Sequence, residues 1–354
     1  MTTITTVCGT RPEIIKLSKL VPLLDKNFDN TFMFTCQHYS KFMVDNFFDE
    51  LGIRKPDQIL DVKSSSYPDL IKSINTSMKE NKPSYVIVYG DTNSTLAAAI
   101  VAKNLNIKLI HIEAGLRSFD KEMPEEFNRV ITDHASDILF TPTELTKTFL
   151  LREKIDKNVF VVGNPVVDVC LQFVPKAENS KILEKLDLEA KNYLLLTQHR
   201  QEYVDVPERL AKILLALENL EQTVVFPIHP RTKKRLEQFN LKLPSNVIAT
   251  EPLGYLDFLK LLKNAEIVLT DSGGVQEEAI TLKVPCLTTR NSTERWESVM
   301  AGGNILVGIE PNLIGYYVKM IKESDLGEKM RNTTNPYGDG TTSEQIINIL
   351  KRCL

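Results

Sequence analysis

Short apolar runs alternate with amphipathic stretches along most of the chain. Glycine, proline or polar residues bound these runs, which have the length of buried strands. The predicted strands cover residues 4–8, 31–36, 85–89, 108–112, 138–140, 159–162, 193–197, 223–227, 247–250, 267–270 and 286–288. Because helical patterns lie between successive runs, crossover helices should join the strands, which then run parallel in their sheets.

The stretches between the runs carry helical signals. One helix is expected over 12–24, where Pro12 suits the first helical position, and the aromatic spacing of Phe42, Phe47 and Phe48 predicts another. Further helices are expected over residues 67–79, 93–105, 129–135, 143–152, 275–282 and 343–354. This alternation of strand and helix is typical of a doubly wound α/β fold.

The chain has 354 residues, which is more than a single core usually serves. The polar stretch Pro175–Ser180 precedes a new series of strands and helices. We therefore predict two doubly wound, Rossmann-like domains, over residues 1–165 and 166–342, with an active site in the cleft between them. The final helix, 343–354, fits either half on its pattern alone.

Two acidic residues end neighbouring predicted strands in the stretch 85–129. Asp91 follows one strand and Glu113 the next, with Glu125 and Arg129 close behind. The carboxyl ends of parallel strands are where open α/β sheets bind ligands, so these side chains are candidates for one site. Asp91 alone is equally well interpreted as a helix cap.

Two other turns carry groups suited to an anionic ligand. In the first, Gly9–Glu13, Arg11 lies at the end of a strand, although a surface ion pair between Arg11 and Glu13 is the alternative. In the second, Ser272–Gly274 opens a helix whose free N–H groups and dipole favour phosphate, and a plain tight turn is the alternative. Glu277 and Glu278 follow within one helical turn, where an acid can bind sugar hydroxyls.

The histidines are candidates for proton transfer and not for metal binding. His199 follows a predicted strand next to Arg200, and His229 has the equivalent place on the next strand. His111 and His134 are interpreted as scaffold residues near the site. None of the five histidines has the spacing of a metal site, so no metal is expected.

Composition narrows the function further. The formal net charge of −3 provides no electrostatic footprint for nucleic acid or an anionic membrane. No apolar run is long enough to cross a membrane, and the N-terminus lacks the pattern of a signal peptide. Five scattered cysteines favour a reducing compartment, so we expect a cytoplasmic protein.

Carboxylates in one domain and an anion-binding helix in the other suit a sugar nucleotide. The segments that carry these groups also resemble the non-hydrolysing UDP-N-acetylglucosamine 2-epimerases, in order and over essentially the whole chain. They are GTRPEIIK (9–16), GDTNST (90–95), HIEAGLRS (111–118), PEEFNR (124–129), DSGGVQEEA (271–279) and NPYGDG (335–340). The resemblance implies the two-domain GT-B fold, a C-terminal helix that packs back on the first domain, and a homodimer.

The resemblance also implies a reaction without an added cofactor. UDP-GlcNAc would become UDP-ManNAc, a precursor of surface polysaccharides, by elimination of UDP and its re-addition to a 2-acetamidoglucal. The implied catalytic residues are Lys16, Asp91, Glu113, Glu125, Arg129 and His199. The implied substrate-binding residues are Arg11, Phe258, Ser272, Gly273, Gly274, Glu278 and Arg295, with Phe258 against the uracil and Glu278 on the ribose.

Departures from the family pattern leave alternatives open. In bacterial members, one segment helps to form a pocket for a second, activating UDP-GlcNAc. That segment reads Gln37-His38-Tyr39-Ser40 in this chain. The residues of the pocket that this chain retains are Gln37, His38, Arg200 and His229. The segments 117–120 (RSFD) and 229–232 (HPRT) resemble epimerases of UDP-2,3-diacetamido-glucuronate or of UDP-N-acetyl-fucosamine-type sugars. A hydrolysing epimerase, a GT-B glycosyltransferase and a sugar-nucleotide sensor are the further alternatives.

Overall fold

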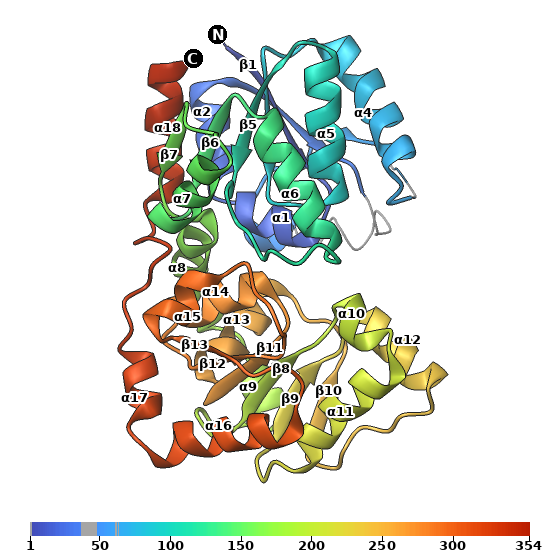
Figure 1. Ribbon diagram of the computed structural model, residues 1–354, viewed down its shortest axis with the longest axis vertical. Helices are drawn as coiled ribbons and strands as arrows, with labels where there is room; N and C mark the ends of the chain where they lie inside the picture. Colours follow the sequence, from blue (N-terminus) through green and yellow to red (C-terminus); the bar gives the residue numbers. More distant parts are fainter. Residues whose placement is uncertain (1, 37–47, 61, 63) are drawn as a thin grey trace. The chain divides into compact units, whose positions relative to one another are not determined.

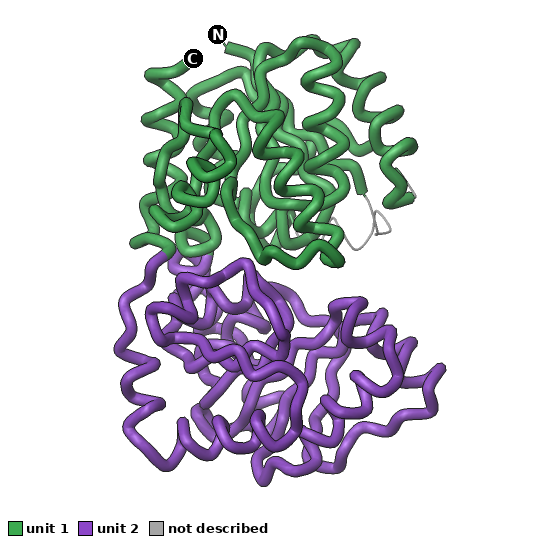
Figure 2. Tube along the Cα trace, viewed as in Figure 1, with its two compact units in different colours: residues 1–169, 337–354 green, residues 170–336 purple. Residues whose placement is uncertain are grey.

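The structure, a computed structural model, describes residues 2–36, 48–60, 62 and 64–354 (Figure 1). The chain forms two compact units: unit 1 comprises residues 1–169 and 337–354, and unit 2 comprises residues 170–336 (Figure 2). Unit 1 thus includes 166–169 and 337–342, which the sequence analysis placed in the second domain. Most of the helix predicted around Phe42 and Phe47 lies outside the described residues.

Within its described residues, unit 1 holds a seven-stranded parallel sheet in the order β3-β2-β1-β4-β5-β6-β7. The strands are β1 (Thr3–Cys8), β2 (Asp29–Phe34), β3 (Gln58–Ile59), β4 (Tyr85–Tyr89), β5 (Lys108–Ile112), β6 (Ile138–Thr141) and β7 (Val159–Val161). The strand order reverses between β1 and β4, which defines the switch point of the sheet. The two-residue strand β3 is too short for its pattern to predict it.

The described helices of unit 1 are α1 (Arg11–Leu17), α2 (Leu20–Asn27), α4 (Tyr67–Asn81), α5 (Asn93–Asn104), α6 (Pro124–Ala135), α7 (Glu144–Arg152), α8 (Pro165–Ala177, which continues into unit 2) and α18 (Thr342–Cys353). The single helix predicted over 12–24 is wrong. The Ser18 N–H donates to the carbonyl of Ile15, three residues back, and the tightened turn separates α1 from α2.

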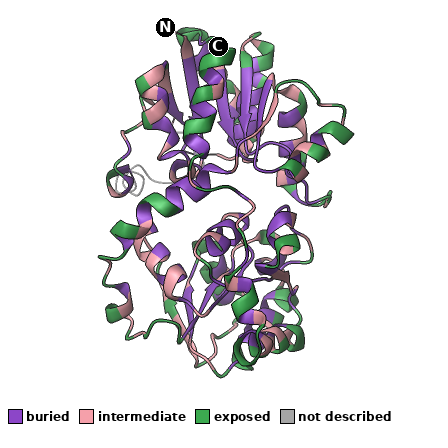
Figure 3. Cartoon of the chain, turned by 90° about the vertical axis from the view of Figure 1, so that its left-hand side faces the viewer, coloured by how far each residue is buried: buried purple, intermediate pink, exposed green. Residues whose placement is uncertain are grey.

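The core of unit 1 lies between the sheet and its helices. Val7, Val88 and Leu109 face α4 and α5, and the alanines of α5 let it pack close to the strands. Helices α4, α5 and α6 lie side by side (Figure 1), while α2 packs on β2 and on α18. Figure 3 shows the strands of this unit buried among their helices.

Residues 163–168 hold the chain that returns to unit 1. The Asp168 carboxylate accepts the N–H groups of Thr342 and Ser343 at 3.1 and 2.6 Å, which caps the start of α18. The Asn164 N–H donates to the carbonyl of Tyr337 at 2.8 Å. These bonds are the physical reason that 337–342 belongs with unit 1.

Unit 2, all of whose residues are described, holds a six-stranded parallel sheet in the order β10-β9-β8-β11-β12-β13. The strands are β8 (Leu194–Thr197), β9 (Val224–Pro227), β10 (Val247–Thr250), β11 (Ile267–Thr270), β12 (Cys286–Thr288) and β13 (Asn304–Leu306). Its switch point lies between β8 and β11. The sequence analysis missed β13, a three-residue strand that follows two glycines.

The helices of unit 2 are α9 (Ile182–Lys185), α10 (Gln201–Val204), α11 (Pro207–Glu218), α12 (Pro230–Gln238), α13 (Tyr255–Asn264), α14 (Gly273–Thr281), α15 (Trp296–Ala301), α16 (Pro311–Glu323) and α17 (Leu326–Arg331). Two apolar clusters cover the two faces of the sheet, one built with α11 and α16, the other with α13 and α14. The fold class is therefore as predicted: two doubly wound parallel-sheet α/β units. Among the described residues, no helix is both long and apolar enough to cross a membrane.

Candidate functional site

Three turns of unit 1 lie at the carboxyl ends of β1, β4 and β5, beside the switch point. They carry Arg11, Asp91 and Glu113, the residues that the strand-end argument selected. Strands β1 and β4 are neighbours, as are β4 and β5. The three turns therefore share one edge of the sheet, where a ligand can reach all of them.

Glu113 is held on one oxygen by two donors. Its side chain is buried, and its Oε2 accepts hydrogen bonds from Lys16 Nζ at 2.7 Å and from Asn164 Nδ2 at 2.9 Å. Lys16 also lies over the ring of Tyr89, 5.0 Å from its centroid. Glu113 has a φ of +70°, a left-handed conformation that is rare outside glycine. Strain of this kind is common at functional sites, where the surroundings enforce it.

The ring of His111 bonds to the backbone of the turn that carries Asp91. Gly90 has a φ of +67°, and a Cβ placed on it would lie 3.6 Å from Glu113 Oε1. The buried ring of His111 spans from the carbonyl of Gly90 at 2.8 Å to Asp133 at 2.7 Å. His111 is thus in contact with the backbone of the site turn. His134, in contrast, is half exposed on α6.

Asp133 is the centre of a buried network of charged and polar groups next to the turn that carries Asp91. Its carboxylate accepts bonds from the Gly115 N–H at 3.1 Å and from Arg117 at 2.7 Å, in addition to the His111 contact. Burial works to raise the pKa of Asp133, but its bonds to His111 and Arg117 hold the pKa below the usual range. Glu153 occupies the other edge of the Arg117 guanidinium with two bonds of 2.7 Å.

Asp91 is bound by Arg129, and its interpretation as a helix cap is wrong. The residue that caps α5 is Thr92, whose side chain accepts the N–H of Thr95. Two nitrogens of the Arg129 guanidinium donate to Asp91 Oδ2, and a third nitrogen donates to Glu126. Glu126 has a structural role as well, because it accepts bonds from the backbone that leads into α6.

Glu125 and Arg11 are each half buried at the start of a helix. Glu125 is the second residue of α6, close enough to Tyr67 for its charge to act on the phenol. Burial, and then the charge of Glu125, raise the pKa of Tyr67, whose hydroxyl donates to Asn128 at 2.6 Å. Arg11 is the first residue of α1.

Glu13 is a site residue whose role the sequence analysis missed. Its side chain is buried, and Oε2 accepts the N–H groups of Gly9 and Thr10 at 3.0 and 2.8 Å. The hydroxyl of Thr92 donates to Oε1 at 3.1 Å, so Glu13 joins the turns after β1 and β4. Burial raises its pKa to about 7. The interpretation as a surface partner of Arg11 is wrong, and the pattern Thr10-x-x-Glu13, a capping box, was the signal available.

In unit 2, Asp271 occupies the switch point between β8 and β11. It is fully buried and accepts the backbone N–H groups of His199 and Arg200, each at 2.7 Å. His199 Nδ1 lies 2.9 Å from the other carboxylate oxygen. Burial works to raise the pKa of Asp271, but the charge of His199 and these bonds hold it below the usual range.

The N-terminus of α14 follows Asp271 directly. Ser272 is its N-cap, and Gly273 opens the helix. A Cβ on Gly273 would lie 2.4 Å from Glu294 Oε1, so the Glu294 carboxylate would have to move for any other residue, whereas a Cβ on Gly274 would meet no atom within 4 Å. Gly273 is buried, while Ser272 and Gly274 are partly exposed and have open backbone at the positive end of the helix dipole.

Buried ion pairs support this helix start. Arg295 lies 3.0 Å from Glu277, and Arg290 donates to Glu294 at 2.8 Å. Arg200 reaches the same Glu294, at 3.6 Å. The sequence analysis selected Arg295 and Arg200 but missed Arg290 and Glu294, which pair with each other four residues apart in the loop after β12.

The remaining selected residues of unit 2 lie on α13, α14 and the turn after β9. Glu278 is buried and accepts the hydroxyl of Tyr255 at 3.0 Å. Phe258 lies on α13, is half buried and packs on the core of unit 2. His229 is exposed and caps α12, with its ring centroid 5.5 Å from that of His199. Gln37 and His38, the other two residues selected for a second pocket, lie outside the described residues.

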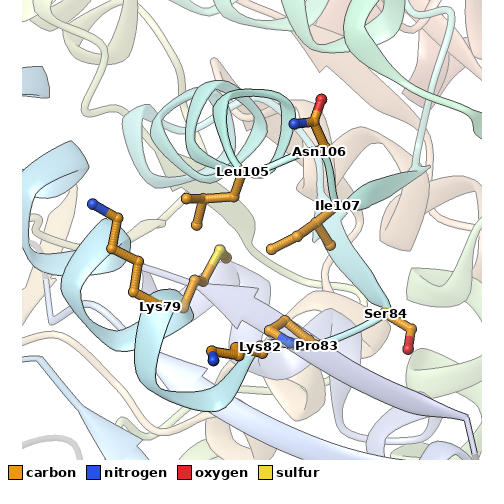
Figure 4. A pocket seen from close by; sticks show the side chains of 8 residues that line it. Lys79, Lys82, Pro83, Ser84, Leu105, Asn106 and Ile107 are labelled. Atoms are coloured by element: carbon orange, nitrogen blue, oxygen red, sulfur yellow. The ribbon is translucent and has the colours of Figure 1, made fainter.

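One pocket of unit 1 lies away from Asp91 and Glu113. A pocket of about 410 Å³ is lined by residues at the end of α4 and between α5 and β5, including Lys79, Lys82 and Asn106 (Figure 4). This is the edge of the sheet where β4 and β5 begin, opposite to the one that carries Asp91 and Glu113. No group of three or more potential ligand side chains able to hold a metal occurs among the described residues.

Known proteins match this chain over nearly its whole length. The family model described as UDP-N-acetylglucosamine 2-epimerase matches residues 23–351. A protein of that name from Methanocaldococcus jannaschii is 48% identical over 97% of each chain. A UDP-2,3-diacetamido-2,3-dideoxy-D-glucuronate 2-epimerase from Pseudomonas aeruginosa is 38% identical over 99% of each chain.

Solved structures of the same kind have the same fold. The M. jannaschii UDP-GlcNAc 2-epimerase in complex with UDP-GlcNAc and UDP superposes with a TM-score of 0.92, at 46% identity and 99% coverage of each chain. The enzyme from Neisseria meningitidis bound to UDP-GlcNAc gives a TM-score of 0.88, at 33% identity and 99% coverage of each chain. The chain described above therefore belongs to the UDP-N-acetylglucosamine 2-epimerase family.

Proposed function

We propose that the protein interconverts UDP-GlcNAc and UDP-ManNAc by inverting carbon 2 of the sugar. The observation that carries this proposal is the pair of carboxylates, Asp91 and Glu113, on one sheet edge, each bound to a cation. Arg129 binds Asp91 and Lys16 binds Glu113. A carboxylate held beside a reacting carbon can act as a general base.

The chemistry requires a base, an acid and a stable leaving group. A carboxylate takes the proton from carbon 2 while the bond from carbon 1 to the UDP oxygen breaks, which leaves a 2-acetamidoglucal and UDP. UDP then adds back to carbon 1, and a second group returns a proton to carbon 2 from the opposite face. In this scheme Asp91, Glu113 and Glu125 exchange the protons, and the overall reaction consumes nothing.

We assign the nucleotide to groups of unit 2, and we assign Arg11 to the diphosphate as well. The N–H groups of Ser272–Gly274 and the dipole of α14 favour the diphosphate, and Arg295 adds positive charge beside them. Glu278 would bind the ribose hydroxyls, and Phe258 would stack on the uracil. His199, with Nδ1 bound to Asp271, keeps Nε2 for proton exchange with the departing phosphate.

A related substrate is the second candidate. The relative from P. aeruginosa, named for UDP-2,3-diacetamido-2,3-dideoxy-D-glucuronate, is 38% identical to this chain and supports this alternative. Separately, Arg200 and His229 are candidates for a pocket that binds a second, activating UDP-sugar. A cytoplasmic homodimer that supplies polysaccharide precursors is part of the same proposal.

The test is a proton NMR time course of the purified protein with UDP-GlcNAc in D₂O. The expected result is UDP-ManNAc that carries deuterium at carbon 2, and Glu113→Gln is expected to stop the exchange. Exchange only with a diacetamido-glucuronate or fucosamine-type sugar would move the assignment to the second candidate. If no UDP-2-acetamido sugar exchanged deuterium, the proposed function would be wrong.

A further inference from the structure

The segment Asn335–Gly340 has no role in the proposed chemistry, although its residues from Tyr337 onward pack against Gly163 and Asn164. We call residues 337–343 the returning segment, because they bring the chain back to unit 1. A Cβ on Gly163 would lie 2.8 Å from the carbonyl of Tyr337 and 2.5 Å from the hydroxyl of Thr342. Gly163 itself has a φ of +91°. The backbone of Gly163 and the returning segment are therefore packed too closely for any other residue.

The residue after this glycine, Asn164, is bonded to the returning segment through its backbone. Its N–H donates to the Tyr337 carbonyl at 2.8 Å, and its side chain is fully buried. Its Oδ1 accepts the hydroxyl of Tyr89 and, at 3.4 Å, the N–H of Val166. Because both of these partners are donors, the amide orientation is fixed and the NH₂ group must point the other way.

The NH₂ group of Asn164 points at the carboxylate of Glu113. Nδ2 donates to Glu113 Oε2 at 2.9 Å, and the ammonium of Lys16 donates to the same oxygen at 2.7 Å. An oxygen that accepts from an amide and from an ammonium is unsuited to carry a proton itself. The two bonds therefore fix the rotation of the carboxyl group.

We propose that Asn164 is a positioning residue, which the returning segment holds in place and which orients the Glu113 carboxylate for proton transfer. This inference rests on the proposed function, because it takes Glu113 as one of the groups that exchange a proton with the sugar. The titratable side chains that face the pair include Lys16 from α1 and Tyr89 from β4. Asp91 lies in the next turn, bound to its own arginine.

Two substitutions of Asn164 test whether its amide orients the Glu113 carboxylate or only fills space. Asn164→Asp keeps the shape but places a carboxyl group against Glu113. Like charges at that distance cannot both ionise easily, so the pair should share a proton. Asn164→Ala removes the donor and frees the carboxyl group to rotate. We expect kcat to fall about 10- to 100-fold in Asn164→Ala, as for a lost orienting contact, with the Kd for UDP unchanged.

The direct readout is a carbon NMR titration of protein labelled at the glutamate carboxyl carbon, with the Glu113 signal assigned from Glu113→Gln. In Asn164→Asp, the midpoint of that signal should move to higher pH by about one unit or more. The acid limb of kcat/KM should move in the same direction. Asn27→Asp is the matched control: Asn27 donates to the backbone carbonyl of Leu23 in α2, and the charge change is the same.

Each outcome decides the inference. If the Glu113 midpoint in Asn164→Asp matched that of the wild type and of Asn27→Asp, Asn164 would not act on Glu113. An Asn164→Ala protein with wild-type kcat would overturn the inference as well. If the wild type did not epimerise any UDP-sugar, the proposed function would fail alone, because the titration still reports whether Asn164 controls the ionisation of Glu113.

Discussion

The buried carboxyl group of Glu13 makes the stability of unit 1 depend on pH in a way that one substitution should remove. In Glu13→Gln the side chain keeps its size. The amide oxygen can still accept the N–H groups of Gly9 and Thr10, and the NH₂ group can donate to the hydroxyl of Thr92. The variant therefore resembles the protonated form of Glu13 at every pH.

The sign and size of the effect follow from the raised pKa of Glu13. Burial raises this pKa from 4.5 to about 7. Between these values the folded protein binds more protons than the unfolded chain, so the stabilisation is complete below pH 4.5 and is lost as the pH rises through 7. At about 1.4 kcal/mol for each pH unit between the two pKa values, the full loss is about 3 kcal/mol, of which about 2.5 kcal/mol falls between pH 5 and pH 8.5.

Urea unfolding at pH 5 and at pH 8.5 measures this difference, with far-UV circular dichroism as the probe. The single tryptophan, Trp296, lies on α15 of unit 2, so its fluorescence follows unit 2 and serves as the internal control. We expect wild-type unit 1 to lose about 2.5 kcal/mol more than the Glu13→Gln variant over this range. The tryptophan transition should respond equally to pH in both proteins.

Equal pH dependence of wild type and Glu13→Gln in the circular dichroism transition would refute the reasoning. It would mean that the bonds from the turn after β1 offset the cost of burying the charge. A loss of stability in wild type as the pH falls, and not as it rises, would refute the sign as well.

Other predictions concern the ligand. Asp91→Asn or Glu125→Gln should lower kcat by about 10²- to 10⁴-fold, with the Kd for UDP nearly unchanged, as expected when a general acid or base is removed; a large loss of UDP affinity measured by calorimetry would assign these residues to binding instead. Arg11→Ala should weaken UDP binding first, and an unchanged Kd would exclude Arg11 from the diphosphate site. Gly273→Ala should weaken UDP binding by at least about 10-fold, because its Cβ displaces the buried side chain of Glu294. In Gly274→Ala the new Cβ meets no atom within 4 Å, so this variant should not introduce the clash. Equal effects of the two alanines on UDP binding would contradict this account.

The sequence predicted strands well where apolar runs are continuous and buried. Tyr85–Tyr89 and Lys108–Ile112 have the predicted bounds, because turn residues stop each run at both ends. The short strands β3 and β13 were missed, because so few residues carry too little pattern. The break between α1 and α2 was missed too, since it arises from one tightened turn that propensity does not reveal.

The candidate site was predictable only in part. Residues at strand ends, such as Asp91 and Glu113, were found because topology alone brings strand ends together. Glu13 and Asn164 were missed because their partners lie far away in the sequence: Thr92 is 79 residues from Glu13, and Glu113 is 51 residues from Asn164. Contacts of that range arise from the tertiary fold; the local pattern Thr10-x-x-Glu13 indicates the capping box but not the bond from Thr92 to Glu13.

The division of the chain into units has a consequence for synthesis. Residues 170–336 form a continuous segment, whereas residues 337–354 of unit 1 leave the ribosome only after all of unit 2. Unit 2 can thus fold while unit 1 still lacks α18 and the carbonyl that binds the Asn164 N–H. A nascent chain that stops before residue 337 therefore has Glu113 without the backbone anchor of its positioning residue, and a truncated product should be inactive even where unit 2 has folded completely.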